Sequence, residues 1–261
     1  MKRFALALNY LGTEYKGWQS QPGLSTVQGE LERALSSVAN EPIAVFCAGR
    51  TDAGVHAAKQ VVHFDTTAER DLYNWVLGVN SNLPKDIAVK WMQPVGEDFH
   101  ARFSATARHY RYFLYHQRNR DSLLQGRAAH HCMPLDIASM QTAAAYFLGE
   151  HDFSSFRAIE CQANTTVRTV SRIELTAHNN LLCLDIKANA FLHHMVRNIM
   201  GTLLAVGAGK EKPEWVKDVI EAKDRTVAGI TAPAEGLYMV DIDYPKVFDF
   251  PKDPLFHLFN T

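Results

Sequence analysis

The sequence lacks both a long apolar run and a leader that would direct a chain into or across a membrane. No uninterrupted apolar run reaches the roughly 18 residues that span a bilayer. Residues 1–4 lead directly into strand-like alternation, without an apolar signal region. Of 261 residues, 47% are hydrophobic and 21% charged, which excludes a disordered or low-complexity chain. We therefore expect a soluble, cytoplasmic globular protein that does not associate with membranes.

Cysteine is scarce, and its spacing excludes the common metal knuckles. The four cysteines lie far apart with no CxxC pair, so a structural zinc site is not expected. In a chain of this length without a leader, we expect four reduced thiols. Adjacent histidines at 130–131 and 193–194 do not predict a metal site either, because no carboxylate cluster accompanies them.

Common catalytic signatures are missing as well. The sequence contains no GxxxxGKS/T, HExxH or GxSxG motif, and no GxGxxG motif that follows a strand. These absences argue against nucleotide-dependent chemistry and metal-dependent hydrolysis.

Hydrophobic periodicity predicts one order of elements twice along the chain. Strands are expected at 4–10, 43–46, 61–64 and 87–92, with helices at 25–38, opened by a capping box at Ser25 and Gln28, and at 69–79. Further strands are expected at 110–116, 167–176, 182–188 and 237–242, with helices at 137–148 and 195–206 and an inserted helix at 214–222.

This order predicts an α+β fold made of two β-α-β-β-α-β halves of the ferredoxin or RRM-like kind. Such units form antiparallel sheets with helices on one face. We expect the two sheets side by side, with an active-site cleft between them. We expect a first domain at residues 1–105, which carries a catalytic aspartate loop, and a second domain at residues 106–261. The end of the second domain, from residue 247, is expected to be an irregular tail.

The net charge of −1 conceals a strongly basic stretch. Residues 99–131 contain six arginines, five histidines and a single acid, a formal charge of +5, whereas the rest of the chain carries −6. Aromatic residues are interleaved with these charges, which suits phosphate neutralisation combined with base stacking. A solvated strand face with aromatics turned inward explains the same pattern. Candidate phosphate contacts are Arg102, Arg118 and His131.

One polar loop stands out between two apolar strands. Residues 49–57 read GRTDAGVHA and hold Arg50 and Asp52 between glycines that permit unusual backbone angles. A hairpin loop in which Asp52 caps a turn would explain the pattern. Polar loops on rigid sheets are also where catalytic groups concentrate.

Several strings of residues, in order, resemble the tRNA pseudouridine synthase A family. They are AGRTDAGVHA at 48–57, NSNLP at 80–84, FHARF at 99–103, YRY at 110–112, DFSSF at 152–156, AFLHHMVRNI at 190–199 and EGLY at 235–238. The resemblance covers about residues 3–244 and is closest to the bacterial branch.

The resemblance implies an isomerase that converts uridine to pseudouridine at positions 38, 39 and 40 of the tRNA anticodon stem-loop. It implies that Asp52 is the catalytic nucleophile or base and that Arg197 pairs with it. Tyr110 would lie against the target uracil, Leu237 would line the pocket, and Arg50 would hold the target base out of its stack. Family members are homodimers that need neither metal nor cofactor.

The reaction itself is compatible with these residues. Pseudouridine formation is an isomerisation without net redox change, so a carboxylate in a closed pocket can suffice; Asp52 could attack C1′ or remove the C2′ proton. Two other functions remain open. A non-catalytic RNA-binding module would use the same basic and aromatic face, and a hydrolase would pair Asp52 with a second carboxylate, which the loop does not contain.

Overall fold

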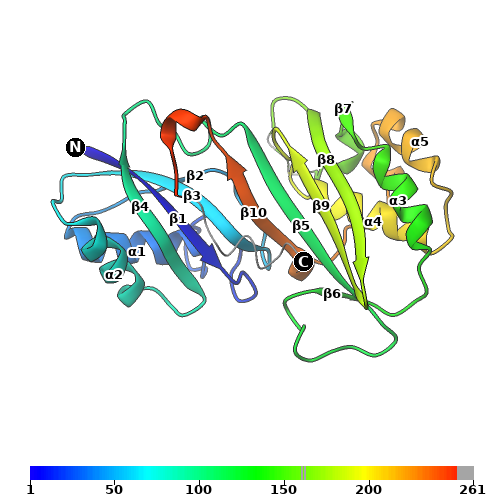
Figure 1. Cartoon of the computed structure of the whole chain (residues 1–261), viewed down its shortest axis with the longest axis horizontal. Coiled ribbons are helices and arrows are strands. Elements are labelled where there is room, and N and C mark those ends of the chain that lie inside the picture. Colours follow the sequence, from blue (N-terminus) through cyan, green and yellow to red (C-terminus); the bar gives the residue numbers. More distant parts are fainter. Residues whose placement is uncertain (160, 162, 252–261) are drawn as a thin grey trace. The chain divides into compact units, whose positions relative to one another are not determined.

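The computed structural model describes residues 1–159, 161 and 163–251 and divides the chain into two compact units (Figure 1). Unit 1 contains Met1–Thr106 and the chain from Tyr238 onward, and unit 2 contains Ala107–Leu237. The sequence analysis grouped all residues after 105 in one domain, so the return of the C-terminal segment to unit 1 differs from that expectation. Residues 252–261 of the expected irregular tail lie outside the described residues. No helix in the described part of the chain is long and apolar enough to cross a membrane.

The sheet of unit 1 has the strand order β4, β1, β3, β10. Strand β1 (Lys2–Tyr10) lies antiparallel between β4 (Ile87–Val95) and β3 (His56–Thr66), and the short β2 (Phe46–Cys47) is antiparallel to β3. Strand β10 (Leu237–Asp243) runs parallel to β3. From the sequence this strand is expected as the last of the second half; in the structure it pairs with β3 through Tyr238 and Met239.

Two helices complete the first half in the expected order. Helix α1 (Val27–Ala39) packs beside α2 (Leu72–Asn82), which inserts Trp75 against the cross-strand pair Phe4 and Phe64. The N-cap of α1 is Thr26, whose side chain accepts a hydrogen bond from the Gly29 amide, rather than Ser25 of the expected capping box. These contacts bury one face of the sheet.

Aromatic rings hold the C-terminal segment on the opposite face of the same sheet. His63 alternates with Phe64 along β3 and therefore points the other way, where its ring contacts Phe99. Phe99 is fully buried and contacts the rings of Tyr244, Phe248 and Phe250. The packing of these rings explains why the chain after 238 belongs to unit 1.

The sheet of unit 2 has the strand order β5, β9, β8, β7. Strand β9 (Leu181–Ala188) lies antiparallel between β5 (Ala107–His116) and β8 (Val167–His178), and β7 (Gly149–Asp152) is antiparallel to β8. The three-residue β6 (Ala129–His131) runs parallel to β5. The sequence analysis did not anticipate β6 or β7, because strands of three or four residues show too little alternation.

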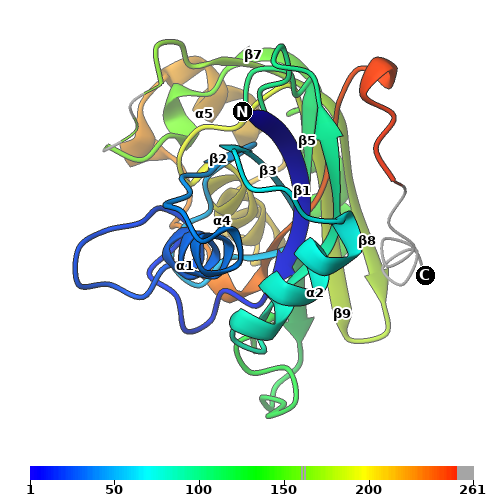
Figure 2. The same ribbon diagram turned by 90° about the vertical axis from the view of Figure 1, so that its left-hand side faces the viewer.

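The helices of unit 2 lie on one side of its sheet (Figure 2). They are α3 (Ile137–Ala145), α4 (Met195–Gly207) and α5 (Trp215–Ala222). In both units together, the described residues also form short 3-10 helices at Ser154–Phe156, Arg225–Val227, Ala234–Gly236 and Lys246–Phe248. Helices α3 and α4 approach closely because Gly207 faces Met140, so that a Cβ at Gly207 would stand 2.5 Å from the Met140 sulfur. The α+β class expected from the sequence is confirmed, with strands and helices in each unit.

Candidate functional site

The Asp52 loop, residues 49–55, connects β2 to β3 and is held mainly by backbone contacts. The Trp18 amide donates to the Thr51 carbonyl oxygen at 2.9 Å, and the Gly54 amide donates to the Tyr15 carbonyl oxygen at 3.4 Å. The Gln60 side-chain amide donates to the Gly49 carbonyl oxygen at 2.6 Å. The segment before α1 and strand β3 therefore fix the course of the loop from two sides.

Two glycines in the segment before α1 permit this close approach. A Cβ on Gly12 would overlap the Val55 carbonyl oxygen, and the Gly12 amide donates to His56 Nδ1 at 2.9 Å. Gly17 has a φ of +92°, and a Cβ there would lie 2.9 Å from the Thr51 carbonyl oxygen. Neither glycine was predicted from the sequence to matter, because residues 11–26 contain three glycines, at 12, 17 and 23, and nothing local marks the two that touch the loop.

Within the loop, side chains alternate in exposure. Thr51 is buried and shares a 2.8 Å hydrogen bond with the Tyr10 hydroxyl, Asp52 is half-buried, and Arg50 is exposed. The Val55 amide donates to the Asp52 carbonyl oxygen at 3.1 Å, which closes the turn through the backbone. Asp52 therefore lies on a turn that backbone hydrogen bonds hold in place, and its side chain is partly exposed to solvent. A carboxylate that acts as a nucleophile or a base requires such a fixed and accessible position.

A buried ring pair supports the end of the loop. His56 is fully buried, and its ring stacks on Tyr238 with centroids 4.4 Å apart. These two residues are also partners in the parallel pairing of β3 with β10. The sequence analysis quoted both residues within motifs but assigned neither a role.

In unit 2, Tyr110 is buried at the centre of β5. Its ring meets Phe191 edge to face, with centroids 4.9 Å apart, and only 7% of the residue is exposed. Leu237 is also buried. The neighbouring Tyr112 donates its hydroxyl to the Pro233 carbonyl oxygen at 2.8 Å, and a Cβ on Gly236 would collide with the Tyr112 ring. The segment that leads into Leu237 is thereby fixed against β5.

Arg197 lies in the first turn of α4 and is half-buried. Its Nε donates to the Ala232 carbonyl oxygen at 2.8 Å, and the Ala232 amide donates to the Arg197 carbonyl oxygen at 3.1 Å. The segment 229–232 can cross α4 this closely because Gly201 has no Cβ to overlap the Ile230 carbonyl oxygen. These bonds restrict the guanidinium group to one region, as expected for a positioned charge rather than a surface arginine.

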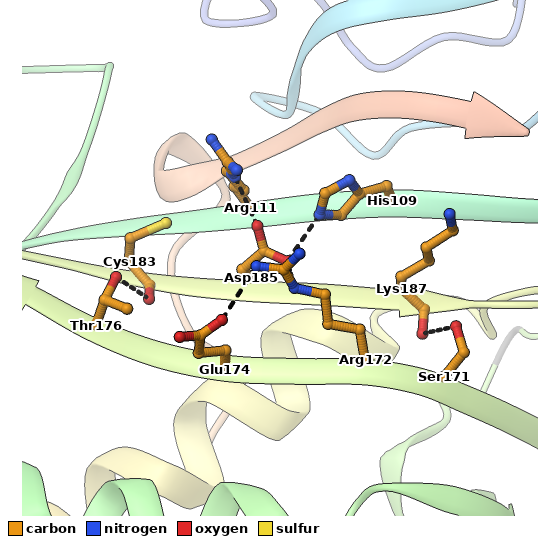
Figure 3. A network of polar contacts seen from close by, with 9 residues as sticks. All are labelled: His109, Arg111, Ser171, Arg172, Glu174, Thr176, Cys183, Asp185 and Lys187. Carbon is orange, nitrogen blue, oxygen red and sulfur yellow. Dashed lines mark hydrogen bonds and ion pairs between the residues drawn. The ribbon is translucent and has the colours of Figure 1, made fainter. Parts of the chain in front are cut away.

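Strand β5 is fixed on both sides of Tyr110 by a charged cluster that we call the Asp185 network (Figure 3). The Asp185 carboxylate on β9 lies 2.8 Å from His109 Nε2, 2.8 Å from Arg111 Nε and 3.1 Å from Arg172 Nε. Asp185 is the register partner of Arg111, and His109 and Arg111 alternate with Tyr110, so they point to the opposite face of the sheet.

The electrostatics of the network favour an ionised Asp185. Burial raises the pKa of its carboxyl group, but hydrogen bonds and charges from His109 and Arg111 outweigh burial and leave the pKa below its usual value. Asp185 was not predicted from the sequence, because no local pattern shows the strand register that places it opposite Arg111 and close to His109.

The three candidate phosphate contacts have different surroundings. Arg102 and Arg118 are exposed, in the loops that precede and follow β5, and the Arg102 guanidinium lies over the Phe103 ring at 5.6 Å. His131 in β6 is half-buried, and burial, with the nearby His116 and His130, lowers its pKa. A neutral imidazole is a weaker phosphate ligand than a guanidinium, so the surroundings favour the two arginines.

The predicted site residues are divided between the units. Unit 1 carries Asp52, Arg50 and Arg102, and unit 2 carries Tyr110, Arg197, Leu237, Arg118 and His131. Within unit 1, Arg50 and Arg102 share one neighbourhood: burial raises the pKa of the Cys47 thiol to about 11, and the charges of both arginines oppose that shift.

The sequence was compared with known proteins. A family model described as tRNA pseudouridine synthase matches residues 6–104 and 143–245. Relatives named tRNA pseudouridine synthase A are 56% identical in Aliivibrio salmonicida, with 98% of each chain covered, and 56% identical in Escherichia fergusonii, with 98% of this chain and 95% of the relative covered. The relative in Vibrio cholerae is 54% identical, with 98% and 97% covered. The similarity extends over nearly the whole chain.

Proposed function

Since the chain belongs to the tRNA pseudouridine synthase family, we propose that it is an isomerase that converts uridine to pseudouridine in tRNA. The finer assignment is that it acts at positions 38, 39 and 40 of the anticodon stem-loop, with Asp52 as the catalytic carboxylate. The observation that supports Asp52 in this role is the Asp52 loop, in which the aspartate lies half-buried on a turn fixed by β3 and by the segment before α1. The three tRNA positions rest on the resemblance to the family.

The chemistry requires little beyond a positioned carboxylate. The N1–C1′ bond of uridine breaks, the uracil turns, and a C5–C1′ bond forms; C5 then loses its proton and N1 gains one, so neither electrons nor atoms are exchanged with a second substrate. Asp52 stabilises the sugar during bond exchange, either by attack on C1′ or by removal of the C2′ proton. Both roles require the ionised carboxylate.

We assign residues of unit 2 to two roles, which are binding of the uracil base and stabilisation of the negative charge on Asp52. The buried ring of Tyr110, braced by Phe191, and the side chain of Leu237 offer the flat and apolar surface that an extruded uracil needs. Arg197, held by Ala232, supplies positive charge that favours the ionised form of Asp52. Arg50 stabilises the extruded base, and Arg102 and Arg118 bind phosphates.

Further parts of the assignment follow from the substrate. A polyanionic substrate needs more positive charge than a chain of net charge −1 offers, and a homodimer would present the basic stretch at residues 99–131 twice. Because tRNA is used in translation, we place the enzyme in the cytoplasm.

The deciding experiment is incubation of the purified protein with unmodified tRNA transcripts, followed by nucleoside analysis. We expect pseudouridine without released uracil, mapped to positions 38–40, and none with the Asp52→Asn variant. Release of free uracil would instead indicate a hydrolase. Tight tRNA binding without any conversion would indicate a non-catalytic binding module.

A further inference from the structure

A ladder of rings lies on the surface of unit 1, outside the residues assigned to catalysis. This aromatic patch consists of Phe46, His63, His100 and Phe103. Phe46 stacks on His63 with centroids 5.1 Å apart and planes at 20°, because the two are register partners in β2 and β3. His100 lies 4.5 Å from His63 and 4.4 Å from Phe103. The rings therefore form one continuous row.

The two ends of the row are open to solvent while its middle is anchored. Phe46 is 55% exposed and Phe103 is 76% exposed, whereas His63 is buried. Large apolar rings that remain exposed within one patch are unfavourable in water and mark a binding surface more often than isolated ones do.

The backbone around the patch is rigid, so the rings are presented in a fixed arrangement. The Ala101 amide donates to His63 Nδ1 at 3.1 Å, and the Arg102 amide donates to His100 Nδ1 at 3.2 Å. The His100 amide in turn donates to the Ser104 hydroxyl oxygen at 3.0 Å. Phe99, one residue before this turn, is anchored in the aromatic cluster with Tyr244, Phe248 and Phe250.

Both histidines take part as neutral rings. A ring nitrogen that accepts a hydrogen bond carries no proton, and Nδ1 is the acceptor in each. In agreement, burial, assisted by His100 and Arg3, lowers the pKa of His63 to about 4, and burial with Arg3 lowers the pKa of His100. The row therefore presents uncharged π surfaces.

Positively charged side chains lie near both exposed rings of the row. The Arg102 guanidinium lies over the Phe103 ring, and Arg50 and Arg102 both act on the Cys47 thiol next to Phe46. The third guanidinium, that of Arg3, is already neutralised by paired 2.8 Å bonds to Asp65. Exposed rings flanked by guanidinium groups suit a strand of RNA, in which a base stacks and the adjoining phosphate pairs with arginine.

We propose that the aromatic patch is a stacking site for an unpaired tRNA base other than the target uridine, with Phe103 as the platform and Arg102 on the neighbouring phosphate. The inference rests on the proposed function, because it takes tRNA as the ligand. It assigns Phe46 and Phe103 to binding and gives them no part in bond exchange. A protein partner would use the apolar rings without needing the flanking arginines.

The test compares RNA binding by variants that change the ring but not the fold. Phe103→Leu keeps apolar bulk and removes the π surface, Phe103→Trp enlarges it, and Tyr73→Ala removes a ring of equal exposure, 74%, on α2 as a matched control. Filter binding of unmodified tRNA across a salt series should show about tenfold weaker binding for Phe103→Leu, roughly 1.4 kcal/mol. The salt slope should stay unchanged, because stacking releases no counterions. Phe103→Trp and Tyr73→Ala should bind like wild type.

A second binding series uses Phe46→Leu and short RNA probes. An oligouridylate should bind wild type more tightly than a blunt duplex of equal length, and both leucine variants should remove that preference. Thermal melting identifies any variant that fails to fold, and in that case photocrosslinking of 5-bromouridine RNA to the wild-type chain decides. A crosslink in residues 99–104 supports the stacking site, and crosslinks confined to other segments overturn it.

The same protein preparations separate this inference from the proposed function. Pseudouridine formation with undiminished affinity in both leucine variants would overturn the stacking site and leave the enzyme assignment intact. Weaker binding by the leucine variants, together with no pseudouridine formation by the wild-type protein, would support the stacking site and overturn the enzyme assignment. Loss of self-association by the leucine variants in sedimentation, with unchanged RNA affinity, would overturn the stacking site in favour of a protein interface.

Discussion

The Asp52 loop of unit 1 and the Tyr110 segment of unit 2 hold their functional residues by different physical means. Around Asp52 the contacts are mostly between backbone groups, and Gly12 lets two chain segments touch. On either side of Tyr110 in β5, His109 and Arg111 point to the opposite face of the sheet and converge with Arg172 on Asp185 (Figure 3). The first arrangement depends on the absence of a side chain, and the second depends on a single carboxylate.

The difference determines how each region can fail. Backbone hydrogen bonds do not titrate, so the Asp52 loop should tolerate changes of pH and charge but not added volume. A buried carboxylate with several cationic partners leaves those partners uncompensated when it is lost, so the Tyr110 segment should tolerate volume changes better than loss of charge. Substitutions in each region can test this contrast.

The largest effect is expected at Asp52 itself. Asp52→Asn is nearly isosteric and leaves the backbone bonds of the loop in place, so folding and tRNA affinity should stay close to wild type. Turnover should fall at least about a thousandfold, roughly 4 kcal/mol of barrier. Single-turnover assays and filter binding measure the two quantities, and a loss of less than about tenfold would return Asp52 to the role of a turn residue.

Gly12→Ala tests whether the loop depends on close backbone approach. The new Cβ would overlap the Val55 carbonyl oxygen, so the loop must move, and we expect a rate loss of about 30- to 100-fold with about 1–3 kcal/mol of destabilisation. Gly78→Ala in α2 is the matched control, because its Cβ would meet a side chain, Val38 at 3.2 Å, rather than backbone, and alanine favours a helix. Equal behaviour of the two variants would mean that the loop is not fixed by Gly12.

Asp185→Asn tests the charge-dependent region. The variant removes the carboxylate that Arg111, His109 and Arg172 share, and we expect about 2–3 kcal/mol of destabilisation and a rate loss of up to about tenfold, because Tyr110 loses its fixed position. Glu174→Gln, at the exposed rim of the same network, should cost less than about 1 kcal/mol. Urea unfolding and single-turnover rates measure both. Similar losses at the rim and the centre would argue against Asp185 as the organising group.

Arg50 and Arg118 separate conversion from docking. Arg50→Ala should leave tRNA affinity within a few-fold of wild type but slow conversion about tenfold, since the extruded base loses a stabilising group. Arg118→Ala should weaken binding a few-fold and lower the salt slope by about one counterion, with little effect on the rate at saturating enzyme. An unchanged salt slope for Arg118→Ala would identify that arginine as a solvated surface residue.

The smallest effect concerns pH and unit 1. The pKa of His63 is lowered to about 4, whereas the ring titrates near 6.5 when the chain is unfolded. The unfolded chain therefore binds the extra proton first, so His63 contributes stability above pH 6.5 that is lost as the pH falls from 6.5 to 4. Between pH 7 and 5 we expect a loss of about 1–2 kcal/mol in urea unfolding. His63→Asn, which retains an acceptor for the Ala101 amide, should reduce that loss, and an undiminished loss would assign it to other groups.

Much of the architecture could be predicted because it follows from local patterning. Alternation in β1 and β5 and the helical spacing in α1 and α4 identified these elements from the sequence, although Thr26 rather than Ser25 proved to be the N-cap of α1. Strands β6 and β7 were missed because three or four residues are too few to show a recognisable alternation. The motif around Asp52 was found because its charged residues interrupt two apolar strands.

Other features depend on contacts between residues far apart in the chain. The sequence by itself determined the α+β class, the basic stretch and the family, because composition, periodicity and motifs are local properties. Only the tertiary structure decided that β10 pairs with β3 in unit 1 and that Gly12 gives the Asp52 loop its room. It also decided that Asp185 contacts His109, Arg111 and Arg172, and that Phe103 lies at one end of the aromatic patch. The physical reason is that register, close approach and charge pairing arise when distant segments pack together, and no local pattern encodes which partner will be met.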